Sequence, residues 1–480
     1  MTPIDFYTIL PLILLGIWTC VLLLVDLFIP KEGKGMTALL AALGLALTLG
    51  FTLSQVGRES TGFNGMVVLD GFSVFVNALL LVSGLLGVAL AYGYVKRVGI
   101  ERGEYYTFLL FSITGMMLMA QAADLIVVFL ALELLSIPLY VLAAFARPKA
   151  ESEEAGLKYF LLGAFSTGFV VYGIALVFGA TGTTSIMEVV GAASTGTSAL
   201  LLTIGAALIL VGFGFKVALV PFHMWTPDVY QGAPSAVTAF MSSGAKIAGF
   251  AALLRVFTTA FPSIAADMTD ILWALAASTM ILGNVIAIAQ TNIKRLLAYS
   301  SIAHAGYILM AFVPYGNPDV APVSIAAGLF YLVAYAVTNF GAWGVVIALE
   351  KSEGRGLEIA DYGGLARKHP ALAAAMTVFM LSLIGLPPTL GLVGKFYLFR
   401  SVIAGGFTGL AIIGVLTSLV SAYYYLRVVV IMYMRDGEPE TERESFLDLT
   451  TGATALATVV LSLVPQFLFA WASNAVLKLF

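Results

Sequence analysis

The sequence predicts an all-α polytopic membrane protein with about fourteen transmembrane helices. Apolar residues make up 60% of the chain, charged residues only 11%, and the mean hydropathy is +1.00. A soluble fold cannot bury that much apolar surface, because helices that are apolar all round need lipid or other helices on every side. Most apolar runs are too long for barrel strands, and lipid requires their backbone groups to pair internally, so these runs must be helices.

The membrane spans follow from the positions of the apolar runs. The N-terminal residues include Asp5 and no basic group, so we expect an anchored first helix and no cleaved signal. The loops are short, the longest lying between Glu350 and Pro370, and no soluble domain is expected. The predicted spans are residues 6–29, 36–56, 73–95, 105–121, 125–146, 156–180, 198–225, 233–258, 271–290, 296–314, 322–349, 371–407, 408–433 and 451–476.

Basic residues are distributed unevenly over the predicted loops. With both termini on the periplasmic side, fifteen basic residues lie in cytoplasmic loops, and four (Arg58, Arg255, Arg400 and Lys478) lie on the opposite side. The positive-inside rule favours this orientation. The fifteen are Lys31, Lys34, Lys96, Arg97, Arg102, Arg147, Lys149, Lys294, Arg295, Lys351, Arg355, Arg367, Lys368, Arg435 and Arg443.

Two predicted spans are too long for one ordinary helix and contain prolines. The run 371–407 includes Pro387-Pro388, and the run 198–225 breaks near Pro221. These broken spans lie five spans apart, which predicts two inverted five-helix repeats with the breaks near an ion pathway. The expected parts are an N-terminal group of three helices (1–104), the first repeat with helices 4–8 (105–258), the second repeat with helices 9–13 (271–433) and a C-terminal loop and helix (434–480).

Four charged residues lie deep within predicted spans. Glu133 and Lys246 lie near span centres, and Lys216 and Lys395 lie beside the two proline breaks. Each costs at least ~2.5–3.5 kcal/mol at a helix centre, so we expect these side chains to face the bundle interior and to have partners. Desolvation lowers the pKa of a lysine and a nearby carboxylate raises it, so a carboxylate that moves can load and release a proton.

Further charged groups have two interpretations each. His304 is either a proton relay, since histidine changes charge near neutral pH, or a packing residue. Lys158 is either a member of the same set or an interfacial lysine that reaches the membrane surface. Asp228 and Lys294 lie in or beside loops, where we expect exposed charges. We therefore predict a polar axis through the membrane middle that contains Glu133, Lys216, Lys246, His304 and Lys395.

The sequence predicts no cofactor or metal site in this chain. The one cysteine, Cys20, excludes a thiolate cluster or an internal disulfide, and we expect it to be a buried, inert thiol. A dinucleotide-binding glycine motif and a P-loop are also missing from the sequence. The net charge of −3 gives no indication of nucleic-acid binding.

Six segments carry a resemblance that covers essentially the whole chain. The chain resembles the antiporter-like subunits of respiratory complex I, most closely the N-type subunit of bacterial NADH:quinone oxidoreductase. An M-type relative is expected to have glutamate in place of Lys395, and an L-type relative to continue into a long lateral helix. The segments are LELLSIPLYVLAAF (132–145), EAGLKYFLLGAFSTG (154–168), KVALVPFHMWTPDVYQGAPSAVTAFMSSGAKIAGF (216–250), NIKRLLAYSSIAHAGYILM (292–310), YLVAYAVTNFGAWGVV (331–346) and GLPPTLGLVGKFYLF (385–399).

This resemblance implies a proton-translocating subunit with fourteen helices, two inverted repeats and four central residues: a Glu133–Lys216 pair, a connecting Lys246 and a terminal Lys395. It implies that NADH, flavin mononucleotide, the iron–sulfur clusters and quinone are bound in other subunits. The implied partners are the other membrane-arm subunits and, indirectly, the hydrophilic redox arm. The expected location is the bacterial plasma (inner) membrane, with a plastid-derived host as the alternative.

Three other functions remain open at this stage. A subunit of a multi-subunit cation/proton antiporter shares these motifs and needs no electron input. A structural membrane subunit is a second alternative, although a scaffold has no use for several costly intramembrane lysines. A solute carrier is a third, but no substrate pocket can be read from the sequence.

Overall fold

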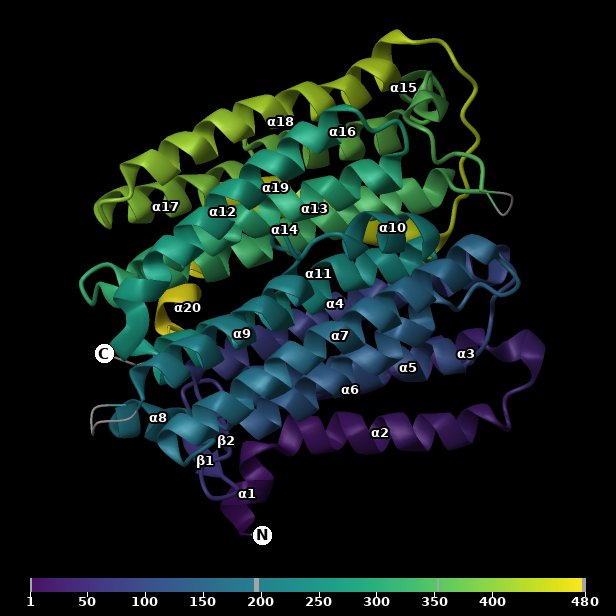
Figure 1. Ribbon diagram of the computed structural model, residues 1–480. Helices are drawn as coiled ribbons and strands as arrows, with labels where there is room; N and C mark the ends of the chain where they lie inside the picture. Colours follow the sequence, from purple (N-terminus) through teal and green to yellow (C-terminus); the bar gives the residue numbers. More distant parts are fainter. Residues whose placement is uncertain (1, 194–197, 352–353, 477–480) are drawn as a thin grey trace.

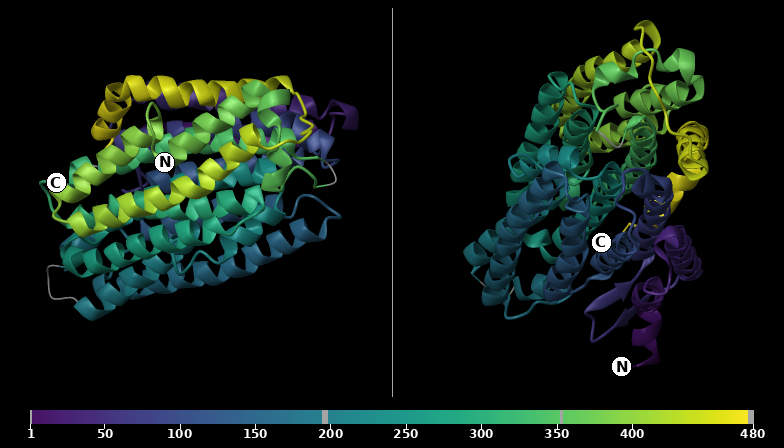
Figure 2. Two further views of the ribbon diagram at one scale, coloured as in Figure 1. Left: turned by 90° about the horizontal axis from the view of Figure 1, so that it is seen from above. Right: turned by 90° about the vertical axis from the view of Figure 1, so that its right-hand side faces the viewer.

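The computed structural model describes residues 2–193, 198–351 and 354–476, which form a bundle of long helices lying side by side (Figures 1 and 2). Within the described residues, eleven helices are long and apolar enough to cross a membrane. The protein is therefore a mostly helical membrane protein, as predicted.

The first part of the chain contains most of its short elements. Strands β1 and β2 pair antiparallel, with Ser60 opposite Leu69, and the span prediction did not include this hairpin. The elements are α1 (Pro3–Thr8), α2 (Leu10–Asp26), η1 (Lys31–Gly33), α3 (Gly35–Ser54), β1 (Ser60–Gly62), β2 (Val67–Leu69), α4 (Gly71–Arg97), α5 (Glu104–Gln121), α6 (Leu125–Ala143), α7 (Ala150–Thr181), α8 (Ile186–Ala193), α9 (Ala199–Val217), α10 (Trp225–Gly232) and α11 (Ser235–Ala260).

The second part of the chain repeats the pattern of long helices joined by short loops. The predicted span 371–407 is two helices, α16 and α17, separated at the proline pair. The elements are η2 (Pro262–Ile264), α12 (Ala265–Ile288), α13 (Ile293–Met310), η3 (Val313–Gly316), α14 (Ala321–Leu349), η4 (Ile359–Tyr362), α15 (Leu365–Lys368), α16 (Pro370–Ile384), α17 (Leu390–Ala404), α18 (Thr408–Met434), α19 (Ser445–Leu463) and α20 (Pro465–Asn474).

Side-chain caps fix where two important helices begin. Asp124 precedes α6 and accepts a hydrogen bond from the Ile126 amide (2.7 Å). Asn292 precedes α13 and accepts from the amides of Lys294 (3.0 Å) and Arg295 (3.2 Å). Such caps satisfy amides that have no partner within the helix, so they stabilise the first turns of α6 and α13.

Three helices form the centre of the bundle. Within the described residues, the most apolar stretch of α11 is buried at every position. In α13 and α14, 94% of the corresponding stretch is buried. Helix α11 packs against α4, α5, α9 and α14, so it joins the first part of the chain to the second. Helices α7 and α18 are buried over a smaller share of their length, with large apolar side chains on the outside, where lipid contact is expected.

The first and last described helices, α1 and α20, lie at the same end of the bundle (Figure 1). Helices α10 and α15 lie at the other end, together with the α2–α3 connection. Lys478, one of the four basic residues assigned to the periplasmic side, lies outside the described residues.

Candidate functional site

Glu133 and Lys216 lie on neighbouring helices but do not pair directly. The half-buried Glu133 carboxylate on α6 accepts a hydrogen bond from the Thr167 hydroxyl of α7 (2.7 Å). The buried Lys216 ammonium on α9 donates to Ser136 Oγ (2.7 Å) and to Tyr159 Oη (3.2 Å). Ser136 follows Glu133 by one helical turn on α6. No direct ion pair joins Glu133 and Lys216 in the described residues: the partner of Lys216, Ser136, lies one turn from Glu133 and donates to the Leu132 carbonyl.

Helix α9 ends directly after Lys216. Ala218 has a left-handed conformation, with φ of +64°, which stops the helix. Pro221 follows and has no amide hydrogen to continue a helix. The Trp225 indole of α10 donates to the Phe215 carbonyl (2.9 Å), so the chain beyond the break is tied back to the last turn of α9. The predicted break near Pro221 is confirmed.

Lys246 joins this break to the second part of the chain. Its buried ammonium on α11 donates to the carbonyls of Ser301 on α13 (2.6 Å) and Val217 (3.3 Å). Val217 is the last residue of α9, where carbonyls lack helical partners and the helix dipole favours a cation. The ammonium also lies 5.8 Å from the ring centre of Tyr335 on α14.

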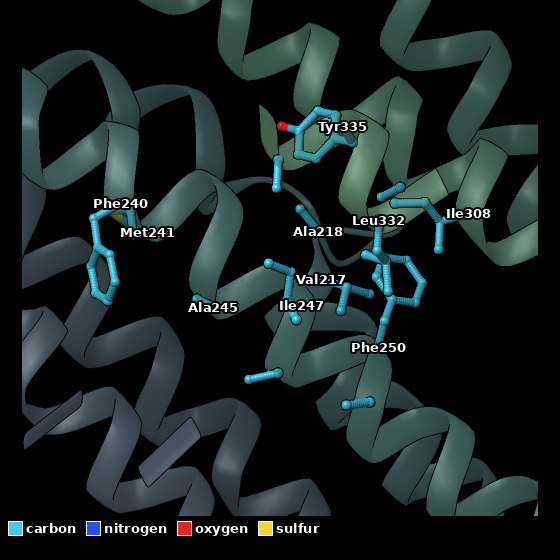
Figure 3. Close-up of a cluster of buried hydrophobic side chains, with 14 of the residues drawn as sticks. Val217, Ala218, Phe240, Met241, Ala245, Ile247, Phe250, Ile308, Leu332 and Tyr335 are labelled. Atoms are coloured by element: carbon cyan, nitrogen blue, oxygen red, sulfur yellow. The ribbon is translucent and has the colours of Figure 1, made fainter. Parts of the chain in front are cut away.

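The surroundings of Lys246 are apolar. Figure 3 shows Val217 beside Ile247 of α11, with Phe250, Ile308 and Leu332 packed close by. Hydrogen bonds and charges interact more strongly in such surroundings than in water, and an unpaired polar group is correspondingly costly there. Each hydrogen bond to Lys246 therefore has a large influence on its position.

His304 on α13 lies between two tyrosines. Its Nδ1 is 2.8 Å from Tyr331 Oη and its Nε2 is 3.3 Å from Tyr425 Oη. Its ring centre lies 5.2 Å from that of Tyr335, the same ring that faces Lys246. Phenol hydroxyls can donate or accept, so both ring nitrogens of His304 have partners in either tautomer.

Lys395 on α17 lies at the second break. Its buried ammonium donates to the carbonyls of Leu383 (3.0 Å) and Ile384 (2.9 Å), the last two residues of α16. It also donates to Ser418 Oγ on α18 (2.8 Å) and lies 4.5 Å from the ring centre of Tyr307. The C-terminal carbonyls of a broken helix therefore hold a lysine at both breaks.

The structure brings five of the six predicted residues into one lateral series. Tyr307 lies between the last two members, because its ring is 5.6 Å from that of His304 and its hydroxyl accepts from Ser418 (3.2 Å). Hydroxyls contact Glu133, Lys216, His304 and Lys395 and can pass a proton by donating on one side and accepting on the other. The hydrogen bonds of Lys246 go instead to two backbone carbonyls. The order of the series is Glu133, Lys216, Lys246, His304 and Lys395.

Lys158 lies apart from this series. Its side chain is 40% exposed and forms ion pairs with Glu154 and Asp228, each at 2.7 Å. Arg295 also pairs with Asp228 (2.9 Å). Burial raises the pKa of Asp228, but hydrogen bonds from Lys158 and Arg295 outweigh it and hold that pKa below its usual value. Lys158 therefore belongs to an ion-pair cluster near the bundle end.

Several residues of the series were not identified individually from the sequence. Tyr159, Tyr307, Tyr331, Tyr425 and Ser418 contact the charged groups. Hydroxyl residues are common throughout the chain, so composition does not distinguish these. A usable signal is the spacing of His304 and Tyr307, which places both on one face of α13.

Two expectations were wrong. Lys294 was expected to be exposed, but it is 2% exposed, because the segment after α14 covers the start of α13 through a hydrogen bond from the Ile293 amide to the Leu357 carbonyl (2.8 Å). Cys20 was expected to be buried, but it is exposed on α2. Helix α2 lies at the edge of the bundle, so one of its faces has no protein neighbour (Figure 1).

Residues 122–421, well over half of the chain, match a family model described as "NADH:quinone oxidoreductase/Mrp antiporter, TM". The chain belongs to this family. The matched part contains all five members of the lateral series.

Family members with curated names support the N-type resemblance. The chain is 45% identical to the NADH-quinone oxidoreductase subunit N of Trichlorobacter lovleyi, covering 98% of this chain and 97% of that protein. It is 44% identical to the subunit N of Chloroflexus aggregans, covering 99% and 98%. The resemblance to N-type subunits of bacterial NADH:quinone oxidoreductase is thereby confirmed.

Chains of two solved structures share the fold. A chain of respiratory complex I from Thermus thermophilus is 37% identical and has a TM-score of 0.83, covering 96% of this chain and 99% of that one. A chain of the Mrp complex from Dietzia sp. has a TM-score of 0.87 at 20% identity, covering 99% and 97%, and shows the fold alone.

Proposed function

We propose that this chain is a proton-translocating membrane-arm subunit of a complex I-type NADH:quinone oxidoreductase. The observation that carries this proposal is the lateral series from Glu133 to Lys395, which places five titratable groups at and between the two helix breaks. Relatives at 44–45% identity over nearly the whole chain have the respiratory subunit name. They favour this function over the cation/proton antiporter alternative.

Proton transfer along the series follows from the partners of each group. Lys216 is bonded to hydroxyls, which can donate or accept, and Glu133 lies one turn from Ser136. When Lys216 moves toward Glu133, the carboxylate stabilises the ammonium, and when it returns to Ser136, that stabilisation is lost and a proton can leave. Lys246 and His304 then connect this event to Lys395.

The driving reaction lies elsewhere in this proposal. NADH, flavin mononucleotide, the iron–sulfur clusters and quinone would be bound by other subunits, and this chain would receive a conformational or electrostatic signal from them. Its direct partners would be other membrane-arm subunits, and the hydrophilic redox arm would act through those. The five residues of the series would carry the protons, and Lys158 would contribute to the ion-pair cluster near the bundle end.

The finer architecture is part of the same proposal. We infer fourteen transmembrane helices, with α9–α10 and α16–α17 as the corresponding broken helices of two inverted five-helix repeats. The parts are residues 1–104, 105–258, 271–433 and 434–480. The membrane would be the bacterial plasma (inner) membrane, with both termini on the periplasmic side. The location of α1 and α20 at one end of the bundle supports both termini lying on the same side of the membrane.

The test uses the intact complex in inside-out membrane vesicles. Lys216→Met, Lys246→Met and Lys395→Met should each reduce the protons pumped per quinone reduced, while the subunit composition of the complex is unchanged. Lys31→Met is the matched control, because Lys31 is exposed in a loop and should leave pumping at the wild-type level. Full pumping in all three buried-lysine variants would contradict the proposal.

A further inference from the structure

A cavity of about 580 Å³ opens near the end of the bundle where α10 lies. Some of the charged side chains that line it are exposed, and others are buried. Lys158 and Asp228 line it and are substantially exposed, whereas Glu350 and Lys294 also line it and are 6% and 2% exposed. The cavity therefore leads from the surface to two buried titratable groups that the lateral series does not include.

The buried end of this cavity has an incomplete hydrogen-bond arrangement. Tyr94 Oη donates to Glu350 Oε1 (3.2 Å) and accepts from the Ser235 amide (3.0 Å). Lys294 donates to the Ala233 carbonyl (2.7 Å). Glu350 Oε2 is buried and has no hydrogen-bond partner among the described residues. A buried carboxylate oxygen without a donor is costly, and a polar cavity of this size has room for the water molecules that would supply one.

Helix α13 leads from this cavity to Lys246. Lys294 and Ser301 are seven residues apart, so they lie on the same face of α13 and about 10 Å apart along its axis. The Ser301 carbonyl accepts the 2.6 Å hydrogen bond from Lys246. The Ser301 hydroxyl is buried and faces the hydroxyls of Tyr230 and Tyr335. One end of this helix face therefore lies at the cavity and the other at the lateral series.

Helix α14 has a matching polar face. Tyr335, Asn339 and Trp343 follow one another at intervals of four residues on one face of α14, and Glu350, directly after the helix, continues this face. Among the described residues, Trp343 Nε1 and Glu350 Oε2 are buried without a hydrogen-bond partner, and the Tyr335 hydroxyl faces that of Ser301. Buried polar groups in native proteins nearly always have partners, and two exceptions along one face indicate bound water.

Asn339 connects this face to α11. Its amide nitrogen donates to Ser242 Oγ (2.7 Å) and Ser243 Oγ (2.9 Å), which lie one turn before Lys246. Asn339 and Glu350 are eleven residues apart, or about 16 Å along the axis. That distance exceeds the reach of one water molecule, so several are needed to connect the two groups.

We propose that protons reach Lys246 from this cavity along a water-lined route between α11, α13 and α14, with Glu350 as its first titratable group. This inference rests on the proposed function. A proton from cavity water forms an O–H bond at Glu350 Oε2, and that bond breaks as the next water takes the proton. The transfer ends when an N–H bond forms on the neutral amine of Lys246. Trp343 has only a donor, so it holds a water molecule in place and does not itself relay.

Water along the route can be tested with cysteines, independently of pumping. In a Cys20→Ala background, Asn339→Cys places a thiol on the route, and Phe340→Cys places an equally buried one on another face of α14. In inside-out vesicles, we expect 2-aminoethyl methanethiosulfonate to modify the Asn339→Cys thiol at least about tenfold faster, because only a hydrated thiol forms the reactive thiolate. Val346→Cys and Ile347→Cys form a second pair. Val346 lies on the same face of α14 as Asn339, and Ile347 lies on the same face as Phe340 and is the control. Equal, slow rates in both pairs would overturn the route and leave the proposed function intact.

Use of the route by protons is tested in the intact complex. Glu350→Gln keeps the shape of the side chain and should lose as much pumping per quinone reduced as Lys246→Met does. Glu151→Gln, which removes an exposed carboxylate lining the same cavity, should pump at the wild-type level. Wild-type pumping in Glu350→Gln together with a loss in Lys246→Met would overturn the route alone. Wild-type pumping in Lys246→Met as well would contradict the proposed function too.

Discussion

The two helix breaks hold their lysines in different ways. At the first break, Lys216 is at the end of the leading helix α9 and bonds only to the hydroxyls of Ser136 and Tyr159. At the second, Lys395 is on the trailing helix α17 and bonds to two carbonyls and one hydroxyl. The carbonyl at the first break is instead bonded by Lys246 from another helix.

This difference indicates different tasks. Carbonyls only accept, so the three donated bonds fix Lys395 in one position, whereas hydroxyls can reverse their direction when Lys216 loses its proton. Lys216 also has the Glu133 carboxylate one helical turn from its Ser136 partner. We infer that the protonation of Lys216 at the first break responds to the Glu133 carboxylate. Lys395 at the second break is held in one position as the last proton-carrying group of the series.

Replacing each lysine by methionine gives the largest expected difference between the breaks. Lys395→Met leaves the Leu383 and Ile384 carbonyls without this donor, which costs about 2–4 kcal/mol. Lys216→Met removes no donor from a carbonyl, and Ser136 keeps its hydrogen bond to the Leu132 carbonyl. Each substitution removes one buried cation, so that contribution largely cancels. We therefore expect the Lys395→Met chain to dissociate from the heated, detergent-solubilised complex at a lower temperature than the Lys216→Met chain. Equal temperatures would show that the two breaks hold their lysines equally firmly.

The residues that stop the leading helices provide the next contrast. Gly385 ends α16 with φ of +91°, and Ala218 ends α9 with φ of +64°. Gly385→Ala should destabilise by about 1–2 kcal/mol, since a side chain is strained in this conformation. The added Cβ would also lie 2.9 Å from Lys395 Cδ. Ala218→Gly removes the same strain and should stabilise by up to about 1 kcal/mol, reduced by the backbone entropy of glycine. The dissociation temperature of the complex should therefore move in opposite directions, and a decrease in both variants would contradict this account.

The sequence predicts these breaks well but not the partners of their lysines. Hydropathy and the prolines at 221 and 387–388 place both interruptions, because a proline removes an amide hydrogen wherever it occurs. The partners of His304, in contrast, lie 27 and 121 residues away. Hydropathy gives the depth of a residue in the membrane, but not how far its helix is rotated about its axis.

The same limitation explains the error at Lys294. Its position beside a loop predicts an exposed charge, yet the segment after α14 folds over the start of α13 and covers it. The β1–β2 hairpin was not predicted because its three-residue strands are too short for a periodic signal. The depth of a residue in the membrane and the ends of helices can therefore be predicted from this sequence. Whether a segment distant in the sequence covers a residue depends on how the chain packs, which the sequence pattern does not show.

The serine at each break provides a smaller test. Ser136→Ala removes one of two hydrogen-bond partners of Lys216, and Ser418→Ala removes one of three partners of Lys395. Each costs about 1 kcal/mol in stability. We expect Ser136→Ala to reduce pumping per quinone reduced more than Ser418→Ala does, and Ser136→Thr to restore it because threonine keeps the hydroxyl. Equal pumping in the two alanine variants would contradict the idea that Lys216 depends on hydroxyls.

The smallest expected effect concerns how the trailing segment of the first break is anchored. Asp228 ties α10 to α7 and α13 through Lys158 and Arg295, and these hydrogen bonds lower its pKa from 3.8 despite the opposing effect of burial. A lowered pKa in the folded state means that the stabilisation is present above 3.8 and is lost as pH falls through the lowered value. Because these side chains are partly exposed, Asp228→Asn should destabilise by at most about 1 kcal/mol. The difference in dissociation temperature between variant and wild type should stay constant from roughly pH 5 to pH 8. A difference that disappears between roughly pH 7 and pH 6 would instead implicate a histidine, since roughly pH 6.5 is where histidine ordinarily titrates.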